Sequence, residues 1–191
     1  MYLTLESVLI VLSVFLAFGL NEWRSQRAER ARAASVLTSF KHEIESNLER
    51  IEASRPRHAR LAEAIAARTA EGVGERAAIS VVTEARTGDG PVILMPAEAA
   101  WQTATSTGAL GLLDYETAAI ISRVYFGQLD QFGQTAGRLT DLAFDARMYD
   151  SDTAAESLEI FGALMDNLVV QEASLIDEYR LALAHLEELG I

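Results

Sequence analysis

The apolar positions of this chain follow two patterns, one continuous and one periodic. Between Val8 and Leu20 the sequence is almost uninterruptedly apolar, and the aromatic residues Tyr2 and Trp23 bracket the run. At about 1.5 Å per residue, a helix between these two aromatic residues is roughly 33 Å long, close to the bilayer's hydrocarbon thickness of about 30 Å. The pattern predicts a transmembrane helix over residues 1–23, with an aromatic ring at each membrane interface.

The rest of the chain has apolar residues at steps of three and four, which is the spacing of one face of an α-helix. Because Pro56 cannot continue a helix but suits its first turn, we expect a helix to end before it and another to begin there. Three long helices, two shorter helices and one loop are expected: residues 24–54, 114–149 and 153–189, residues 56–71 and 96–107, and residues 88–95. The predicted fold is all-α, with one N-terminal transmembrane helix followed over residues 24–191 by an elongated antiparallel helical bundle.

Glu172 lies within the apolar face of the last predicted helix, which keeps its spacing for more than thirty residues. Such a sustained face requires helical partners. A charged residue inside it can set the register or meet a partner, whereas a helix that drifts off a strict heptad exposes it. We expect Glu172 to be exposed.

A cleaved signal peptide is the alternative to a retained span, because Ala17 and Gly19 are small residues near the end of the apolar run. A signal peptide has basic residues before its apolar core, and here that stretch holds only the acid Glu6. The segment is therefore predicted to stay in the protein.

Basic residues follow the apolar run, beginning with Arg24 and Arg27, and none precedes it. By the positive-inside rule, the body beyond them is expected on the cytoplasmic side of a bacterial inner membrane, with a periplasmic body as the alternative. Four residues are predicted to anchor the helix at the membrane interfaces: Tyr2, Trp23, Arg24 and Arg27.

The composition bears on partners more than on chemistry. The chain has 191 residues and no cysteine, which excludes disulfides and thiolate metal sites. Its net charge of −12 is uneven, because residues 61–191 alone carry −14. An acidic body repels a phosphate backbone, so we expect no nucleic-acid partner. The single lysine and the many alanines and arginines suggest a bacterial source with a GC-rich genome.

One side of the predicted span differs from the rest. On a helical wheel, five residues fall within about 80° of each other: Glu6, Ile10, Ser13, Ala17 and Asn21. Small residues let helix backbones approach closely, and an ionisable group in a span generally faces protein or water. This face is a predicted docking site for another transmembrane helix, although Glu6, near the chain end, could simply reach the interface.

Few residues suggest chemistry. His42 and His185 each precede a glutamate by three residues, but such pairs on charged helices are usually solvated, and we expect no metal site. The glycine clusters match neither a dinucleotide motif nor a P-loop, and no nucleophile is paired with a base, so neither a cofactor nor an enzymatic activity is predicted. Trp101 is expected to pack near Tyr125 or Phe126, with a partner hot spot as the alternative.

Two stretches resemble a widespread group of uncharacterised bacterial single-pass membrane proteins. The first runs from Glu6 to Arg24, with an acid at the start of the span and Asn21-Glu22-Trp23 at its end. The second comprises Trp101 and the Ser106 to Leu110 segment, with Tyr125 downstream. The resemblance implies a single-pass membrane protein and no particular activity.

The sequence therefore favours a membrane-anchored accessory, assembly or scaffold subunit of a larger bacterial membrane complex. Its expected partners are membrane lipids and other membrane protein subunits, including copies of itself. The alternative is a membrane-tethered sensor, in which the helical bundle binds a small ligand near Trp101 and the 88–95 loop.

Overall fold

The computed structural model describes residues 2–70, 93, 95–150 and 152–191, with side chains from residue 12 onward. Every regular element among these residues is helical, which confirms the all-α prediction. The elements are α1 (Tyr2–Ala70), α3 (Ala99–Ser106), η1 (Ala109–Leu112), α4 (Tyr115–Phe126), η2 (Gly127–Phe132), α5 (Gly133–Ala143), η3 (Ala146–Met148) and α6 (Ala154–Glu188). Most of the predicted loop at 88–95 lies outside the described residues.

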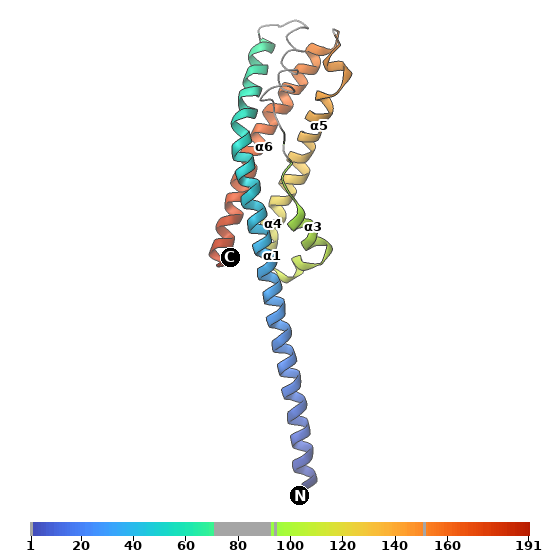
Figure 1. Ribbon diagram of the computed structural model, residues 1–191, viewed down its shortest axis with the longest axis vertical. Helices are drawn as coiled ribbons and strands as arrows, with labels where there is room; N and C mark the ends of the chain where they lie inside the picture. Colours follow the sequence, from blue (N-terminus) through green and yellow to red (C-terminus); the bar gives the residue numbers. More distant parts are fainter. Residues whose placement is uncertain (1, 71–92, 94, 151) are drawn as a thin grey trace.

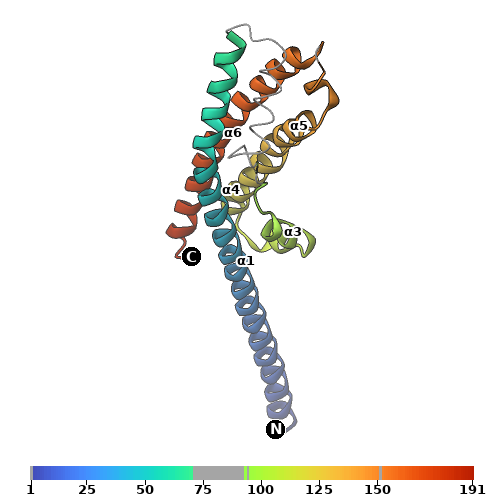
Figure 2. The ribbon, with the colours of Figure 1, turned by 45° about the horizontal axis from the view of Figure 1, so that its top comes forward.

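The bundle is elongated, and α1 extends far beyond it (Figure 1). The second half of α1 packs along α6, which runs in the opposite direction, while α4 and α5 follow each other along the other side of α6. The shorter α3 and η1 lie near the end of the bundle from which α1 emerges. In the turned view of Figure 2, the first half of α1 again projects away from every other helix.

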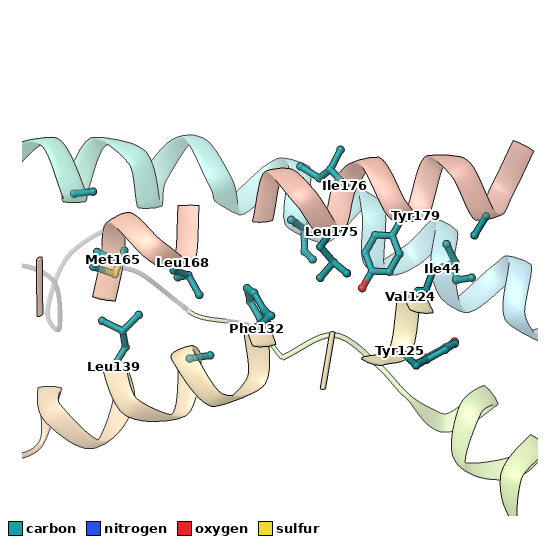
Figure 3. Packing of buried hydrophobic residues seen from close by; sticks show 14 of the residues in the cluster. Ile44, Val124, Tyr125, Phe132, Leu139, Met165, Leu168, Leu175, Ile176 and Tyr179 are labelled. Carbon is teal, nitrogen blue, oxygen red and sulfur yellow. The ribbon is translucent and has the colours of Figure 1, made fainter. Parts of the chain in front are cut away.

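A single hydrophobic core runs along the bundle axis, filled by side chains from α1, α4, η2, α5 and α6 (Figure 3). The prediction for α6 is confirmed to within one residue at each end, and its buried positions keep the spacing of three and four. These positions include Leu158, Phe161, Met165, Leu168, Leu175, Tyr179, Ala182 and Leu186. The sustained apolar face that required helical partners has α1 on one side and α4 and α5 on the other.

The predicted helix break before Pro56 is wrong, because α1 continues through this residue without interruption. Proline removes one backbone donor and crowds the carbonyl of the residue four positions earlier, here Glu52. Both Pro56 and Glu52 are exposed, so water can satisfy that carbonyl. Ile51 and Ile65, on either side of the proline, are both buried in the core. Burial of α1 against α6 therefore maintains the helix where local propensity alone predicts an end.

The predicted helix over 114–149 is interrupted and ends early. Asp114, where the predicted helix begins, caps α4, since its carboxylate accepts the backbone N–H of Thr117 at 3.0 Å. The helix then widens into the π-helical turn η2 and ends with α5 at Ala143. Beyond it, Asp145 accepts the backbone N–H of Arg147 at 2.9 Å and starts the separate turn η3. Asp145 thus caps a separate short turn where the sequence predicts the last turns of one long helix.

Helix α3 begins at Ala99 rather than at 96 as predicted. The backbone of Ala97 is held by the side chain of Asn47, which accepts its N–H and donates to its carbonyl, both at 2.8 Å. These bonds fix residue 97 to α1 before the helix starts.

Among the residues that the structure describes, no helix combines the length and the apolar character needed to cross a membrane.

Candidate functional site

The most distinctive surface of the described chain is the projecting part of α1. Every position from residue 12 to residue 32 is exposed, and no other described helix covers this stretch (Figure 1). Its first part carries large, exposed apolar side chains over most of the helix circumference: Leu12, Val14, Phe15, Leu16, Phe18, Leu20 and Trp23. Isolated exposed apolar residues are normal on proteins, but a contiguous apolar patch marks a surface that contacts a partner or a membrane.

The predicted docking face is partly described. Ser13, Ala17 and Asn21 are exposed positions of α1, as this face requires. The side chains of Glu6 and Ile10, and that of the anchor Tyr2, lie outside the described residues. The face therefore remains a prediction.

Three of the four predicted interface anchors, Trp23, Arg24 and Arg27, lie close together on α1. The guanidinium carbon of Arg27 lies 5.6 Å from the centroid of the Trp23 ring, within the range of a cation–π interaction. Trp23, Arg24 and Arg27 are all exposed, one turn beyond the apolar stretch. An aromatic ring followed directly by cations is typical of the boundary between hydrocarbon and headgroups.

Within the bundle, a buried polar network surrounds Gln128 in the π-helical turn η2. The Gln128 side-chain oxygen accepts the hydroxyl of Tyr179 at 2.6 Å and a weaker bond from Asn47 at 3.3 Å. Its side-chain nitrogen donates to the carbonyl of Ala97 at 2.9 Å. Asn47, Gln128 and Tyr179 are almost fully buried, so α1, α6, η2 and the segment before α3 meet at one satisfied cluster. Such a network specifies one arrangement of the helices, because any misalignment leaves polar groups unpaired.

A second polar cluster joins α1 to the start of α3 and to α4. Glu43 accepts the hydroxyl of Tyr125 at 2.6 Å and the backbone N–H of Ala100 at 2.9 Å. Trp101 stacks on Tyr125 with ring centroids 5.0 Å apart, which confirms the packing predicted for this tryptophan. Burial raises the pKa of Tyr125 and of Tyr179 well above the usual value of 10, so both hydroxyls keep their protons and act as donors. Both carboxylate oxygens of Glu43 thus hold structural partners.

The prediction that Glu172 is exposed is wrong. Its side chain is fully buried, and Oε1 lies 2.7 Å from Nδ1 of His58 on α1, within hydrogen-bond distance. The other ring nitrogen of His58 and the second oxygen of Glu172 are buried without a hydrogen-bond partner among the described residues. Glu172, a charged residue within the apolar face of α6, therefore makes a polar contact with α1 that the sequence did not predict.

The two predicted surface histidine pairs differ. His42 and Glu45 are exposed and 3.5 Å apart, as expected of a solvated helix face. His185 is instead half-buried, and its Nε2 lies 2.9 Å from the hydroxyl of Thr117, so the expectation of a solvated pair is wrong for His185. The described part of the chain holds no group of three or more histidine, aspartate or glutamate side chains arranged to bind a metal ion.

A groove of about 510 Å³ lies between α1 and α3, close to the end of the bundle from which α1 projects. Small residues make up most of its walls, together with the larger polar side chains of His42 and Glu43; the lining consists of Val36, Ser39, His42, Glu43, Ser46, Ala97, Ala99, Ala100, Thr103, Ala104 and Thr107. Trp101 is not part of the lining, because its ring is turned onto Tyr125.

Comparison of the chain with protein-family models, with curated proteins and with solved structures finds no match.

Proposed function

We propose that this protein is a membrane-anchored accessory, assembly or scaffold subunit of a larger bacterial membrane complex. The start of α1, to Trp23, spans the inner membrane, and the acidic bundle is the cytoplasmic body. The rest of α1 connects the two as one helix. Binding through surfaces, rather than chemistry, is the activity.

One observation carries the proposal: the exposed part of α1 is apolar over most of its circumference from Leu12 to Leu20 and polar after Trp23. A helix in water buries one apolar stripe against a core, whereas a helix that is apolar all round is buried in protein or in lipid. The sequence extends the apolar run backwards from Leu12 to Val8. The proposed span therefore includes residues whose side chains the structure does not describe.

The length of α1 between Trp23 and the core also supports a role in holding the bundle at a distance from the membrane. The first residue of α1 that is packed into the core is Leu37, fourteen positions after Trp23. At about 1.5 Å per residue, the core of the bundle begins roughly 20 Å from the proposed membrane interface. Because α1 is a single helix from Tyr2 to Ala70, the spacer is stiff rather than a flexible linker. A rigid connection of this kind holds a body at a set distance from a membrane and from the spans of its partners.

The face containing Ser13, Ala17 and Asn21 is the proposed contact with a partner span. Association of helices in a membrane depends on close packing, which small residues permit and large ones prevent. Replacing Ser13 and Ala17 by leucine keeps the helix apolar but blocks close approach. The exchange of Leu12 for phenylalanine and Phe15 for leucine is the matched control, because these positions lie on the opposite side of α1.

The test is native mass spectrometry of the full chain extracted from its membrane in a mild detergent. We expect an assembly larger than the monomer that persists in the L12F/F15L control and dissociates in S13L/A17L. A wild-type protein that is only monomeric, with no associated protein, contradicts the proposal. An assembly that S13L/A17L leaves intact rules out this face as the contact.

The groove between α1 and α3 favours a second candidate function, the binding of a small ligand by the bundle. Its volume is in the range of ligand pockets, and its mostly apolar walls contain a few hydroxyl groups. Thr103→Trp places a large ring in this groove from an exposed position of α3. A small molecule that co-purifies with the wild type and is lost in this variant supports this function, and its retention in the variant excludes the groove.

A further inference from the structure

Four arginines occupy one short segment of α1, between the apolar stretch and the bundle. Arg24, Arg27, Arg30 and Arg32, here called the arginine collar, are all exposed. None of them forms an ion pair with another described residue, whereas the exposed Arg147 and Arg180 of the bundle each do. The collar is thus a group of exposed cations without an ion-pair partner among the described residues.

The collar is distributed around the helix rather than along one face. On a helical wheel at 100° per residue, its four members cover an arc of about 200°, and the two neighbouring acids, Glu22 and Glu29, share the remaining side. Glu22 is also bonded to Gln26 on that side, at 2.8 Å. A docked protein would contact one face of α1, whereas a layer of headgroups surrounds the helix. The width of the arc favours the second arrangement.

The collar is somewhat longer than a headgroup layer is thick, but its side chains can bridge the difference. From Arg24 to Arg32 the helix rises by about 12 Å, and headgroups add roughly 5 to 8 Å on each side of the hydrocarbon. Flexible arginine side chains reach several ångströms along the helix towards the interface. All four guanidinium groups can therefore meet phosphates at the level set by Trp23.

We propose that the arginine collar binds the headgroups of anionic phospholipids around α1. This inference rests on the proposed function, since it requires that α1 enters the membrane at Trp23. The guanidinium groups donate hydrogen bonds to the lipid phosphates, and the net charge of +3 over residues 24–32 attracts lipids with a negative headgroup over zwitterionic ones.

The remainder of the chain explains why the collar and the spacer occur together. Residues 33–191 carry twelve basic and twenty-five acidic side chains, a net charge of −13. An anionic membrane repels such a body, but the interaction decays over a Debye length of about 8 Å at physiological ionic strength. A spacer of roughly 20 Å exceeds twice this length, so most of the repulsion is screened while the collar lies at the surface.

The experiment measures which lipid lies beside Trp23. The full chain with Trp101→Phe has Trp23 as its only tryptophan, and the substitution keeps an aromatic ring against Tyr125. The protein is reconstituted into vesicles of phosphatidylcholine and phosphatidylglycerol, in which one or the other lipid carries bromine at the same mole fraction. Bromine quenches tryptophan fluorescence on contact, so the ratio of the two quenching efficiencies reports the lipid composition around α1.

We expect brominated phosphatidylglycerol to quench Trp23 about twofold more strongly than brominated phosphatidylcholine, and high salt to reduce the difference. Arg30→Gln with Arg32→Gln lowers this ratio towards one and leaves Arg27 in place over Trp23. Arg60→Gln with Arg138→Gln removes the same charge from exposed positions of the bundle and leaves the ratio unchanged.

Two outcomes would overturn the inference without affecting the anchor: equal quenching by both lipids, or a preference that R30Q/R32Q leaves intact. If neither brominated lipid quenches Trp23, then α1 does not enter the membrane there, and the proposed function fails with the inference.

Discussion

The pair formed by His58 and Glu172 offers the sharpest test of how the bundle is held together. Replacing Glu172 alone by leucine leaves the His58 ring fully buried without its hydrogen-bond partner among the described residues. Removing one member of such a buried pair leaves the other without its partner and lowers the free energy of unfolding by about 1–3 kcal/mol, or by about 3–5 kcal/mol where the pair is ionised. The same loss is expected for His58→Leu, because Glu172 then stays buried beside only the 3.5 Å contact with Ser54.

Replacing both residues by leucine is expected to have the opposite outcome. The double change removes a hydrogen bond of about 1.5–3 kcal/mol, but it also removes two buried atoms without partners among the described residues, His58 Nε2 and Glu172 Oε2. Leaving such an atom unsatisfied costs about 1–3 kcal/mol each. The free energy of unfolding of H58L/E172L should therefore equal that of the wild type or exceed it by up to about 3 kcal/mol.

The assay is guanidinium unfolding of the full chain in detergent, followed by far-UV circular dichroism, with the free energies compared at an unchanged m-value. Glu187→Leu, at an exposed position of α6, is the control for the change in helix propensity and should have little effect. If the double variant loses the sum of the two single losses, the two side chains act independently and the reasoning is refuted.

Three further predictions concern other contacts. A Cβ at Gly162 would lie 2.8 Å from Ile65 Cγ2, so Gly162→Ala should lower the free energy of unfolding by about 1 kcal/mol. Gly137 lies in open space on α5, so Gly137→Ala should raise the free energy of unfolding by about 0.5–1 kcal/mol. Thermal unfolding distinguishes the two signs. Tyr125→Phe removes the donor to Glu43 and should cost about 1.5–3 kcal/mol in chemical unfolding, while Tyr115→Phe, at an exposed position, should cost nothing measurable. Hydrogen bonds from the Arg147 side chain and backbone lower the pKa of Asp145 from 3.8 to about 2, so the contact stabilises the fold above about pH 4 and is lost as the pH falls towards 2. Arg147→Gln removes the side-chain bonds but keeps the backbone bond, so the carboxyl titration, followed by NMR, should move from about 2 part of the way towards 3.8.

Periodicity predicted the long elements of this fold because the same positions that repeat in sequence are buried in the core. Helix α6 illustrates this, since its apolar spacing located the helix to within one residue at each end. Pro56 shows the limit of the local rules. The cost of a proline inside a helix is intrinsic, but the burial that offsets it comes from α6, which is distant in sequence.

The polar contacts could not be assigned because each depends on two elements at once. Glu172 stood out as a charged residue on an apolar helix face, but its partner His58 lies 114 positions away along the chain. Asn47 gave a comparable signal, since it lies at helical spacing between Ile44 and Ile51 and is buried with them. In such cases a polar residue at a core position predicts that a partner exists, and only the structure identifies it.

The π-helical turn η2 explains why Gln128 was also missed. An extra residue in the turn changes which side chains of the following segment face the core. Gln128 and Phe132 are both fully buried in the turn. No motif in the Gly127–Phe132 segment indicates a π-helical turn, so a regular helical wheel assigns the wrong residues to the buried face.

The central claim, that α1 enters lipid before Trp23 and leaves it directly afterwards, can be measured along the helix. Because the chain has no cysteine, single cysteines at exposed positions 12, 16, 20, 24, 28 and 32 can each carry a nitroxide label. In the protein reconstituted into vesicles, the collision rates of each label with oxygen and with a water-soluble nickel complex report lipid and water, respectively. The account predicts oxygen-dominated collisions at 12, 16 and 20, and nickel-dominated collisions at 28 and 32, with the crossover near 24. Collisions dominated by the nickel complex at all six positions would contradict it.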